Sequence, residues 1–235
     1  MKMGIIAAGT GDRFAQRGVI TPKPLIPVNG KPLLMRVIEA GAQLNIKSIA
    51  CIVNDLNPSV AGFLRSGHWP VPVEIVVKTT PSSMESLFCL APLLSDTPFF
   101  LFTVDVVCVQ KDLVDFARKA RALKDSKGAL ALTSFVDDEK PLWAAMNGSN
   151  RITALGDAAR GSRFVTAGFY YFSPDIFAEI DASRRKKFSA LRQFLNHLVD
   201  EGYPIHGVPV PKTIDVDHPE DIEKAEEYLK EINEG

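Results

Sequence analysis

A glycine-containing loop followed by an arginine and a lysine has the residue types that bind a polyphosphate. Gly9, Gly11 and Arg13 come directly after the mostly apolar residues 3–8, and Lys23 follows ten residues after Arg13. Glycines let the backbone approach a ligand, and successive N–H groups in such a loop form a concave site for an anion. Arginine adds a fork of donors that suits phosphate, and lysine adds a compact charge. The pattern predicts a strand, a phosphate-binding loop and two catalytic cations, Arg13 and Lys23.

The spacing excludes the two most familiar nucleotide motifs. The dinucleotide fingerprint needs a third glycine where this chain has Phe14. The P-loop needs Lys-Ser or Lys-Thr where this chain has Thr10 and Gly11. A Gly-x-Gly turn also occurs without any ligand, so the loop alone does not identify what binds.

A longer pattern does point to a family. Residues 7–13 read Ala-Ala-Gly-Thr-Gly-Asp-Arg, and residues 22–33 read Pro-Lys-Pro-Leu-Ile-Pro-Val-Asn-Gly-Lys-Pro-Leu. Together, and in this order, they resemble the nucleotidyltransferases that make nucleoside-diphosphate sugars and related activated head groups. The resemblance covers residues 3–34. It implies a nucleotide site, to which we assign Ala7, Ala8, Gly9, Thr10, Gly11, Asn54 and Ser83.

Two acidic segments are candidates for a Mg²⁺ site, because Mg²⁺ is held by one or two carboxylates together with phosphates and water. Asp105 ends the apolar run 99–104, where a charge is costly unless it reaches solvent or a cation. On its chemistry alone, Asp105 is equally well explained as a strand-end cap; the resemblance makes it the metal aspartate. Asp215 resembles the first aspartate of the family's closing motif. Asp217 is the runner-up and could instead cap the last helix.

Residues 166–172 resemble the family's Asn-Ala-Gly-x-Tyr stretch, with Thr166 in place of asparagine and Gly168 at the glycine. The family's glycine approaches the acceptor, although a strand glycine also fits a β-bulge. We therefore expect Ser86, Thr166 and Gly168 at the acceptor. The upstream Glu-Lys pair of many relatives has no match here, and Arg160 or Arg163 is the candidate substitute.

Length and composition fit one ordinary globular domain. The chain has 235 residues, 46% of them apolar, and a formal net charge of −1. That charge gives no reason to expect nucleic acid or an anionic membrane as a partner. No apolar run approaches the ~20 residues of a membrane helix, and the N-terminal residues lack the layout of a signal peptide. Three widely spaced cysteines predict free thiols in a reducing compartment, and hence a cytoplasmic protein.

Apolar patterning alternates short strands with helices, which predicts parallel strands with helical crossovers. Predicted strands are 3–8, 49–54, 74–77, 99–104 and 129–133, and predicted helices are 33–44, 59–64, 84–94 and 112–124. After residue 135 the pattern favours antiparallel strands at 142–146, 152–155 and 164–172, then helices at 174–180 and 190–201, a strand at 205–209 and a helix from 219 to about 232.

Pattern alone gives a doubly wound α/β fold. The resemblance implies a Rossmann-like three-layer α/β/α domain, with a mixed, mainly parallel sheet and a small antiparallel insertion. We divide it into a nucleotide-binding half, 1–135, and an acceptor-binding half, 136–235.

These observations lead to one expected function and two alternatives. The first is Mg²⁺-dependent transfer of a nucleoside monophosphate from a nucleoside triphosphate to a sugar 1-phosphate, with release of pyrophosphate. The second is a cytidylyltransferase for a phospho-alcohol such as phosphocholine, or an enzyme with a molybdopterin-type acceptor. The third is a non-catalytic nucleotide-binding regulatory protein. The expected partners are a nucleoside triphosphate and a phosphorylated small molecule, and a homo-oligomer is compatible with the sequence.

Overall fold

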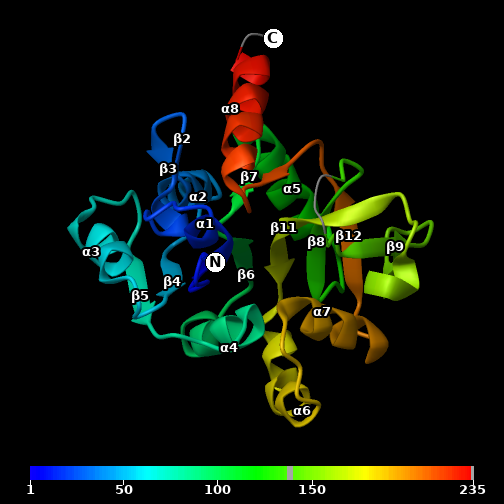
Figure 1. Ribbon diagram of the computed structural model, residues 1–235. Coiled ribbons are helices and arrows are strands. Elements are labelled where there is room, and N and C mark those ends of the chain that lie inside the picture. Colours follow the sequence, from blue (N-terminus) through cyan, green and yellow to red (C-terminus); the bar gives the residue numbers. More distant parts are fainter. Residues whose placement is uncertain (137–139, 234–235) are drawn as a thin grey trace.

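A nine-stranded mixed sheet runs through the computed structural model, which describes residues 1–136 and 140–233 (Figure 1). Seven strands follow the order β10-β9-β11-β6-β1-β4-β5, and β8 joins β11 to β12. The pairs β1–β4, β1–β6, β4–β5 and β8–β12 are parallel, whereas the β11 and β9–β10 pairings are antiparallel. The strands of this sheet are β1 (Lys2–Ala7), β4 (Ile49–Val53), β5 (Val73–Val77), β6 (Phe99–Thr103), β8 (Gly128–Thr133), β9 (Trp143–Met146), β10 (Ile152–Leu155), β11 (Phe164–Phe172) and β12 (Ile205–Pro209).

Helices cover both faces of the sheet. Alternate strand residues enter different cores: Phe100 and Phe102 lie in one, and Phe99 and Leu101 in the other, because successive side chains of a strand point to opposite faces. Helices α2, α3, α5 and α8 pack on the first face, and α4 and α7 on the second. The predicted three-layer α/β/α architecture is thus confirmed. The helices are α1 (Asp12–Gln16), α2 (Leu33–Ala42), α3 (Pro58–Ser66), α4 (Ser83–Leu94), α5 (Gln110–Ala122), α6 (Ile180–Arg185), α7 (Leu191–Asp200) and α8 (Pro219–Asn233), with 3₁₀ turns η1 (Lys23–Leu25), η2 (Gly156–Ala159) and η3 (Pro174–Glu179).

The structure differs from the sequence expectations in a few short elements. The helix expected at 174–180 is the 3₁₀ turn η3, closed by an i to i+3 bond from the N–H of Ile176 to the carbonyl of Ser173, and the α-helix begins only at Ile180. An unexpected hairpin joins β2 (Pro27–Val28) to β3 (Lys31–Pro32). Its turn residues Asn29 and Gly30 both have positive φ, 47° and 70°, as the Asn-Gly turn of a tight hairpin requires.

A two-stranded ribbon brings the C-terminal part of the chain to the end of β6. Strand β13 (Ile214–Asp215) pairs antiparallel with β7 (Val106–Val107), and the N–H of Val216 donates to the carbonyl of Asp105 at 3.0 Å. Because β7 follows β6 after a two-residue turn, this ribbon places both predicted acidic segments at the carboxyl end of the central strands. Ligands bind at that end in open α/β sheets.

The start of α8 is organised without the side chain of Asp217. The buried carboxylate of Asp221 accepts hydrogen bonds from the backbone N–H groups of Asp217 and His218, at 3.1 and 2.8 Å. The carboxylate of Asp217 is therefore available to other partners. None of the helices in the described ranges combines the length and the apolar character that crossing a membrane requires.

Candidate active site

The loop after β1 turns directly into the short helix α1. Gly11 precedes this helix with φ 73°, and its carbonyl accepts the N–H groups of Phe14 and Ala15. A side chain at Gly11 would be strained in this left-handed conformation and would also lie 3.5 Å from Cβ of Lys23. The glycine thus allows the backbone to turn from the loop into the helix that carries Arg13, next to the turn that carries Lys23.

Two cations and two carboxylates meet next to this loop. The Lys23 Nζ lies 2.9 Å from Oδ2 of Asp105 and 2.5 Å from Oδ1 of Asp217. The guanidinium of Arg13 lies 2.5 Å from the other carboxylate oxygen of Asp217. Asp217 was the runner-up for this site, and the structure brings it into contact with both predicted catalytic cations.

Burial and charge together fix the protonation of this ion cluster. Burial of Lys23, whose side chain is 15% exposed, disfavours its charged form, yet the two carboxylates raise the pKa of Lys23 above its ordinary value. Burial likewise disfavours the ionised form of Asp105, but the ammonium of Lys23 and its hydrogen bond hold the pKa of Asp105 below the usual range. Both groups are therefore charged at neutral pH.

Two neighbouring cavities share Asp105, Thr103 and Ser83 in their linings. The first, here called the loop cavity, has a volume of about 320 Å³ and is lined by Ile6, Ala7, Ala8, Gly9, Thr10, Lys23, Pro24, Thr80, Pro81, Ser82, Ser83, Ser86, Thr103, Val104 and Asp105. The second, here called the strand cavity, has a volume of about 200 Å³ and is lined by Ser83, Thr103, Asp105, Leu142, Thr166, Gly168, Tyr170, Ala190, Leu191, Arg192, Leu195, Asp215 and Asp217. The ion cluster lies at their junction.

Most residues predicted for the site line one of these cavities, with four differences. Ser86 lines the loop cavity instead of the acceptor side, and its hydroxyl is 2.6 Å from that of Thr80. Arg13, Gly11 and Asn54 line neither cavity, and Arg13 joins the ion cluster through its contact with Asp217. Gly11 caps α1, and Asn54 is buried beneath the loop, where its side chain donates to the carbonyl of Gly9.

Gly168 is the site of a bulge in β11. Its φ is 75°, and the pairing with β8 shifts register between Thr166 and Tyr170. A Cβ on Gly168 would lie 2.7 Å from Cγ2 of Val106 and 3.0 Å from the hydroxyl of Thr103. The absence of a side chain lets the backbone of β11 pack directly on the residues that flank Asp105, so the bulge interpretation of this glycine is correct.

Arg192 is a cation of the strand cavity that sequence reasoning missed. The guanidinium of Arg160 is paired with Asp157 on the surface, and that of Arg163 stacks on Phe164, so the structure places neither predicted substitute in a cavity lining. Arg192 instead lies in the first turn of α7 and lines the strand cavity. The helix was predicted, but no pattern within it indicates that Arg192 shares a cavity with Asp105.

Serine side chains hold the walls of the two cavities together. Ser82 caps α4 by accepting the N–H of Glu85 at 3.2 Å. The hydroxyl of Ser83 accepts the N–H of Leu191 at 3.2 Å, which fixes the first turn of α7 against the start of α4. Ser83 therefore links the helix bordering the loop cavity to the helix bordering the strand cavity.

The carboxylates of Asp105 and Asp217 suit a divalent cation. Each directs one oxygen at the same ammonium group, so one cation can contact both. Within residues 1–136 and 140–233, no group of three or more His, Cys, Asp or Glu side chains is arranged to hold a metal. This donor set fits Mg²⁺, which commonly takes one or two carboxylates and completes its octahedron with substrate phosphates and water.

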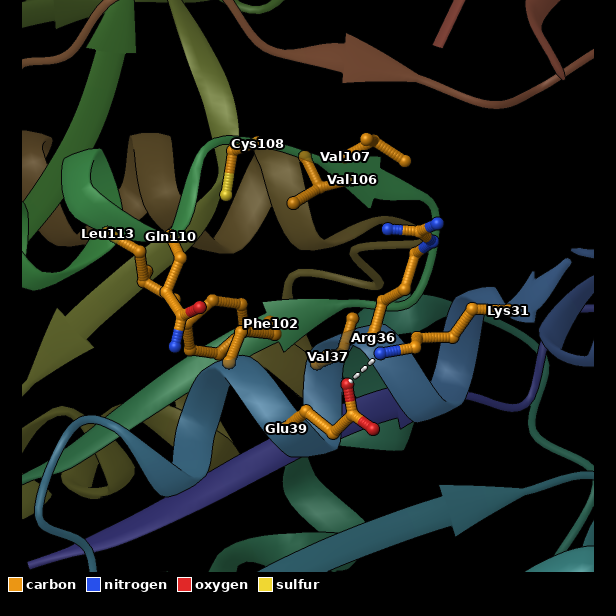
Figure 2. Close-up of a pocket in the computed structure, with 11 residues that line it drawn as sticks. Lys31, Arg36, Val37, Glu39, Phe102, Val106, Val107, Cys108, Gln110 and Leu113 are labelled. Atoms are coloured by element: carbon orange, nitrogen blue, oxygen red, sulfur yellow. Dashed lines mark hydrogen bonds and ion pairs between the residues drawn. The ribbon is translucent and has the colours of Figure 1, made fainter. Parts of the chain in front are cut away.

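A third cavity, of about 160 Å³, lies between α2, β7 and the start of α5 (Figure 2). In this cavity Lys31 pairs with Glu39 at 2.5 Å, and the guanidinium of Arg36 donates to the carbonyl of Val28. Figure 2 shows the sulfur of Cys108 directed into this space. The ion cluster and the phosphate-binding loop belong to the other two cavities, where we place the site.

Comparison with known proteins agrees with this geometry. A mannose-1-phosphate guanyltransferase of Aspergillus oryzae is 24% identical over 194 residues, which are 77% of this chain and 52% of that protein, so the chain spans about half of that relative's length. A UTP–glucose-1-phosphate uridylyltransferase of Haloferax volcanii is 23% identical and is matched over 98% of this chain and 97% of its own. The solved structure of the inositol-1-phosphate CTP transferase from T. maritima superimposes with a TM-score of 0.82 at 19% identity, covering 100% of this chain and 96% of that one. Residues 3–176, which contain the loop, the lysine and Asp105, match the MobA-like NTP transferase domain, and the chain therefore belongs to that nucleotidyltransferase family.

Proposed function

We propose that the protein transfers a nucleoside monophosphate from a nucleoside triphosphate to the phosphate of a small acceptor, with Mg²⁺ and with release of pyrophosphate. The observation that carries this proposal is the junction of the two cavities. Lys23, Asp105 and Asp217 lie where a triphosphate in the loop cavity would meet a phosphate in the strand cavity.

In the proposed reaction, an oxygen of the acceptor phosphate attacks the α-phosphorus of the nucleotide. The new bond from that oxygen to phosphorus forms as the bond between the α-phosphorus and the bridging oxygen breaks, and the electron pair leaves with pyrophosphate. The nucleophile is already an anion, so no general base is needed. Catalysis then rests on positioning and on stabilisation of charge.

The ion cluster is suited to that stabilisation. When bound, Mg²⁺ would be held by Asp105 and Asp217, with Asp215 nearby in the strand cavity, and would neutralise charge on the phosphates. Lys23 would exchange its carboxylate partners for the oxygens of the transferring phosphoryl group. Arg13 and the N–H groups of the loop would hold the leaving pyrophosphate.

The acceptor would bind in the strand cavity with its phosphate on Arg192. A sugar 1-phosphate is the first choice, supported by the named substrates of the similar proteins from Aspergillus oryzae and Haloferax volcanii. A phospho-alcohol is the second choice, supported by three leucines, Leu142, Leu191 and Leu195, in the lining of the same cavity. These apolar side chains would favour an acceptor with fewer hydroxyl groups than a hexose.

The test is pyrophosphate release from ATP, CTP, GTP, UTP and dTTP with Mg²⁺, against sugar 1-phosphates and phosphocholine. We expect release that requires one particular base and one particular acceptor. Lys23→Ala should abolish it, whereas Lys31→Ala, which removes a lysine of the third cavity, should leave it unchanged. A protein that binds nucleoside triphosphates and releases no pyrophosphate with any acceptor would support the non-catalytic alternative instead.

A further inference from the structure

The carboxyl end of β4 lies beside the phosphate-binding loop. Strands β1 and β4 are parallel, with Ala7 opposite Val53. The next residues, Ala8 and Asn54, therefore leave the sheet side by side. The register of the sheet thus brings the side chain of Asn54 beneath the loop, where it is 4% exposed.

Both ends of the Asn54 amide are used. Its Nδ2 donates to the carbonyl of Gly9 at 2.8 Å and to that of Ala8 at 3.4 Å. Its Oδ1 accepts the backbone N–H of Asn57 at 3.0 Å and the side-chain amide of Asn57 at 3.3 Å. Donors are needed on the side of the loop and an acceptor on the side of α3, so the orientation of the amide is fixed by its partners.

Holding these two carbonyls also orients the N–H groups of the loop. In a planar trans peptide, the carbonyl of one residue and the N–H of the next point in opposite directions. The carbonyls of Ala8 and Gly9 point toward Asn54, so the N–H groups of Gly9 and Thr10 point away from it. Ala8, Gly9 and Thr10 all line the loop cavity, and neither N–H group has an acceptor among the residues that the structure describes.

We propose that Asn54 is a positioning residue for the triphosphate: its amide holds the carbonyls of Ala8 and Gly9 so that the N–H groups of Gly9 and Thr10 are aimed at phosphate. The inference rests on the proposed function only in that the loop cavity receives a polyphosphate. Aspartate has the same shape but no donor on the loop side, so it would repel both carbonyls and place a negative charge beneath the phosphate site. An asparagine at the end of β4 is therefore required by geometry and by charge.

The experiment compares Asn54→Asp and Asn54→Ala with Asn57→Ala as the matched control. Asn57→Ala removes a neighbour of the Asn54 oxygen but leaves the donors to the loop intact. Two quantities are measured: the affinity for inorganic tripolyphosphate by calorimetry, and kcat and KM for the nucleoside triphosphate from pyrophosphate release. Thermal unfolding checks that each variant is folded, and Asn54→Ala serves if Asn54→Asp does not fold.

We expect both Asn54 variants to weaken tripolyphosphate binding by about tenfold or more, because each loses the hydrogen bonds that fix two loop peptides. KM for the nucleotide should rise by a similar factor while kcat changes little, and Asn57→Ala should behave like the wild type. Unchanged tripolyphosphate affinity in folded Asn54 variants, or a fall in kcat without a change in KM, would overturn the inference. If the wild type binds tripolyphosphate and the Asn54 variants do not, but no acceptor supports turnover, the proposed function fails and the role of Asn54 stands.

Discussion

Replacing Lys23 with methionine tests the ion cluster directly, because it removes the cation that two carboxylates share. Removing one partner of a buried pair costs about 3–5 kcal/mol, since the other charge stays buried without compensation. Here Asp105 and Asp217 keep 26% and 30% of their side-chain surface exposed, and Arg13 still contacts Asp217. We therefore expect a smaller loss, of about 2–3 kcal/mol.

For a protein of this size, 1 kcal/mol corresponds to about 2–4 °C, so Lys23→Met should lower Tm by about 5–10 °C at neutral pH. The same variant should be stabilised by millimolar Mg²⁺ more than the wild type is, because the carboxylates no longer have a competing ammonium. The assay is differential scanning calorimetry with and without Mg²⁺. Lys31→Met is the control: its partner Glu39 is 40% exposed, and such a surface pair contributes about 0–1 kcal/mol.

The difference between Lys23→Met and the wild type should depend on pH in a defined way. The pKa of Asp105 is lowered in the fold, so its contribution is present above the unfolded value of about 3.9 and is lost as pH falls through the lower folded value. The pKa of Lys23 is raised, so its contribution is present below about 10.4 and is lost only as pH rises through the higher folded value. The difference in Tm should thus be constant from about pH 5 to pH 10 and shrink below about pH 4. A variant as stable as the wild type at pH 7, with no added response to Mg²⁺, would refute this account of the cluster.

Three further predictions concern single features of the site and its surroundings. Gly168→Ala should lower the free energy of unfolding by about 1–2 kcal/mol or more, because alanine is strained in the left-handed backbone conformation of this residue, and it should also raise KM for the acceptor. The control Gly148→Ala places its methyl group in open space and should change neither quantity. Arg192→Met should raise KM for the acceptor by about tenfold or more and leave KM for the nucleotide unchanged, as measured by pyrophosphate release. An equal rise in KM for the acceptor and KM for the nucleotide would exclude a specific contact between Arg192 and the acceptor phosphate. Burial raises the pKa of Cys51 to about 12, so this thiol should not react with a disulfide reagent at pH 8 until the protein is unfolded, and prompt native-state labelling mapped to Cys51 would contradict the structure.

Patterns within short segments of the sequence were sufficient to predict most of the strands and helices of the fold. Continuous apolar runs predicted the central strands because a sheet covered on both faces buries every residue of a strand. Helix α7 and strand β12 were predicted with nearly the observed limits, since amphipathic period and length are properties of a short segment. The Asn29-Gly30 turn carried an equally local signal for the β2–β3 hairpin.

The arrangement of the site depends on contacts between residues that are far apart in the sequence. The sequence alone was enough to predict the phosphate-binding loop, its two cations and the acidic segments, because these residue types and spacings occur within short stretches. Only the tertiary structure decided that Asp217 meets Lys23, from which it is separated by 194 positions, that Arg192 lines the strand cavity, and that Asn54 supports the loop from below. Each of these contacts follows from the pairing of β7 with β13, the packing of α7 against α4, or the register of β1 with β4. Long-range pairing of this kind leaves no periodicity in any one segment, because it is set by the way the whole chain buries its apolar surface.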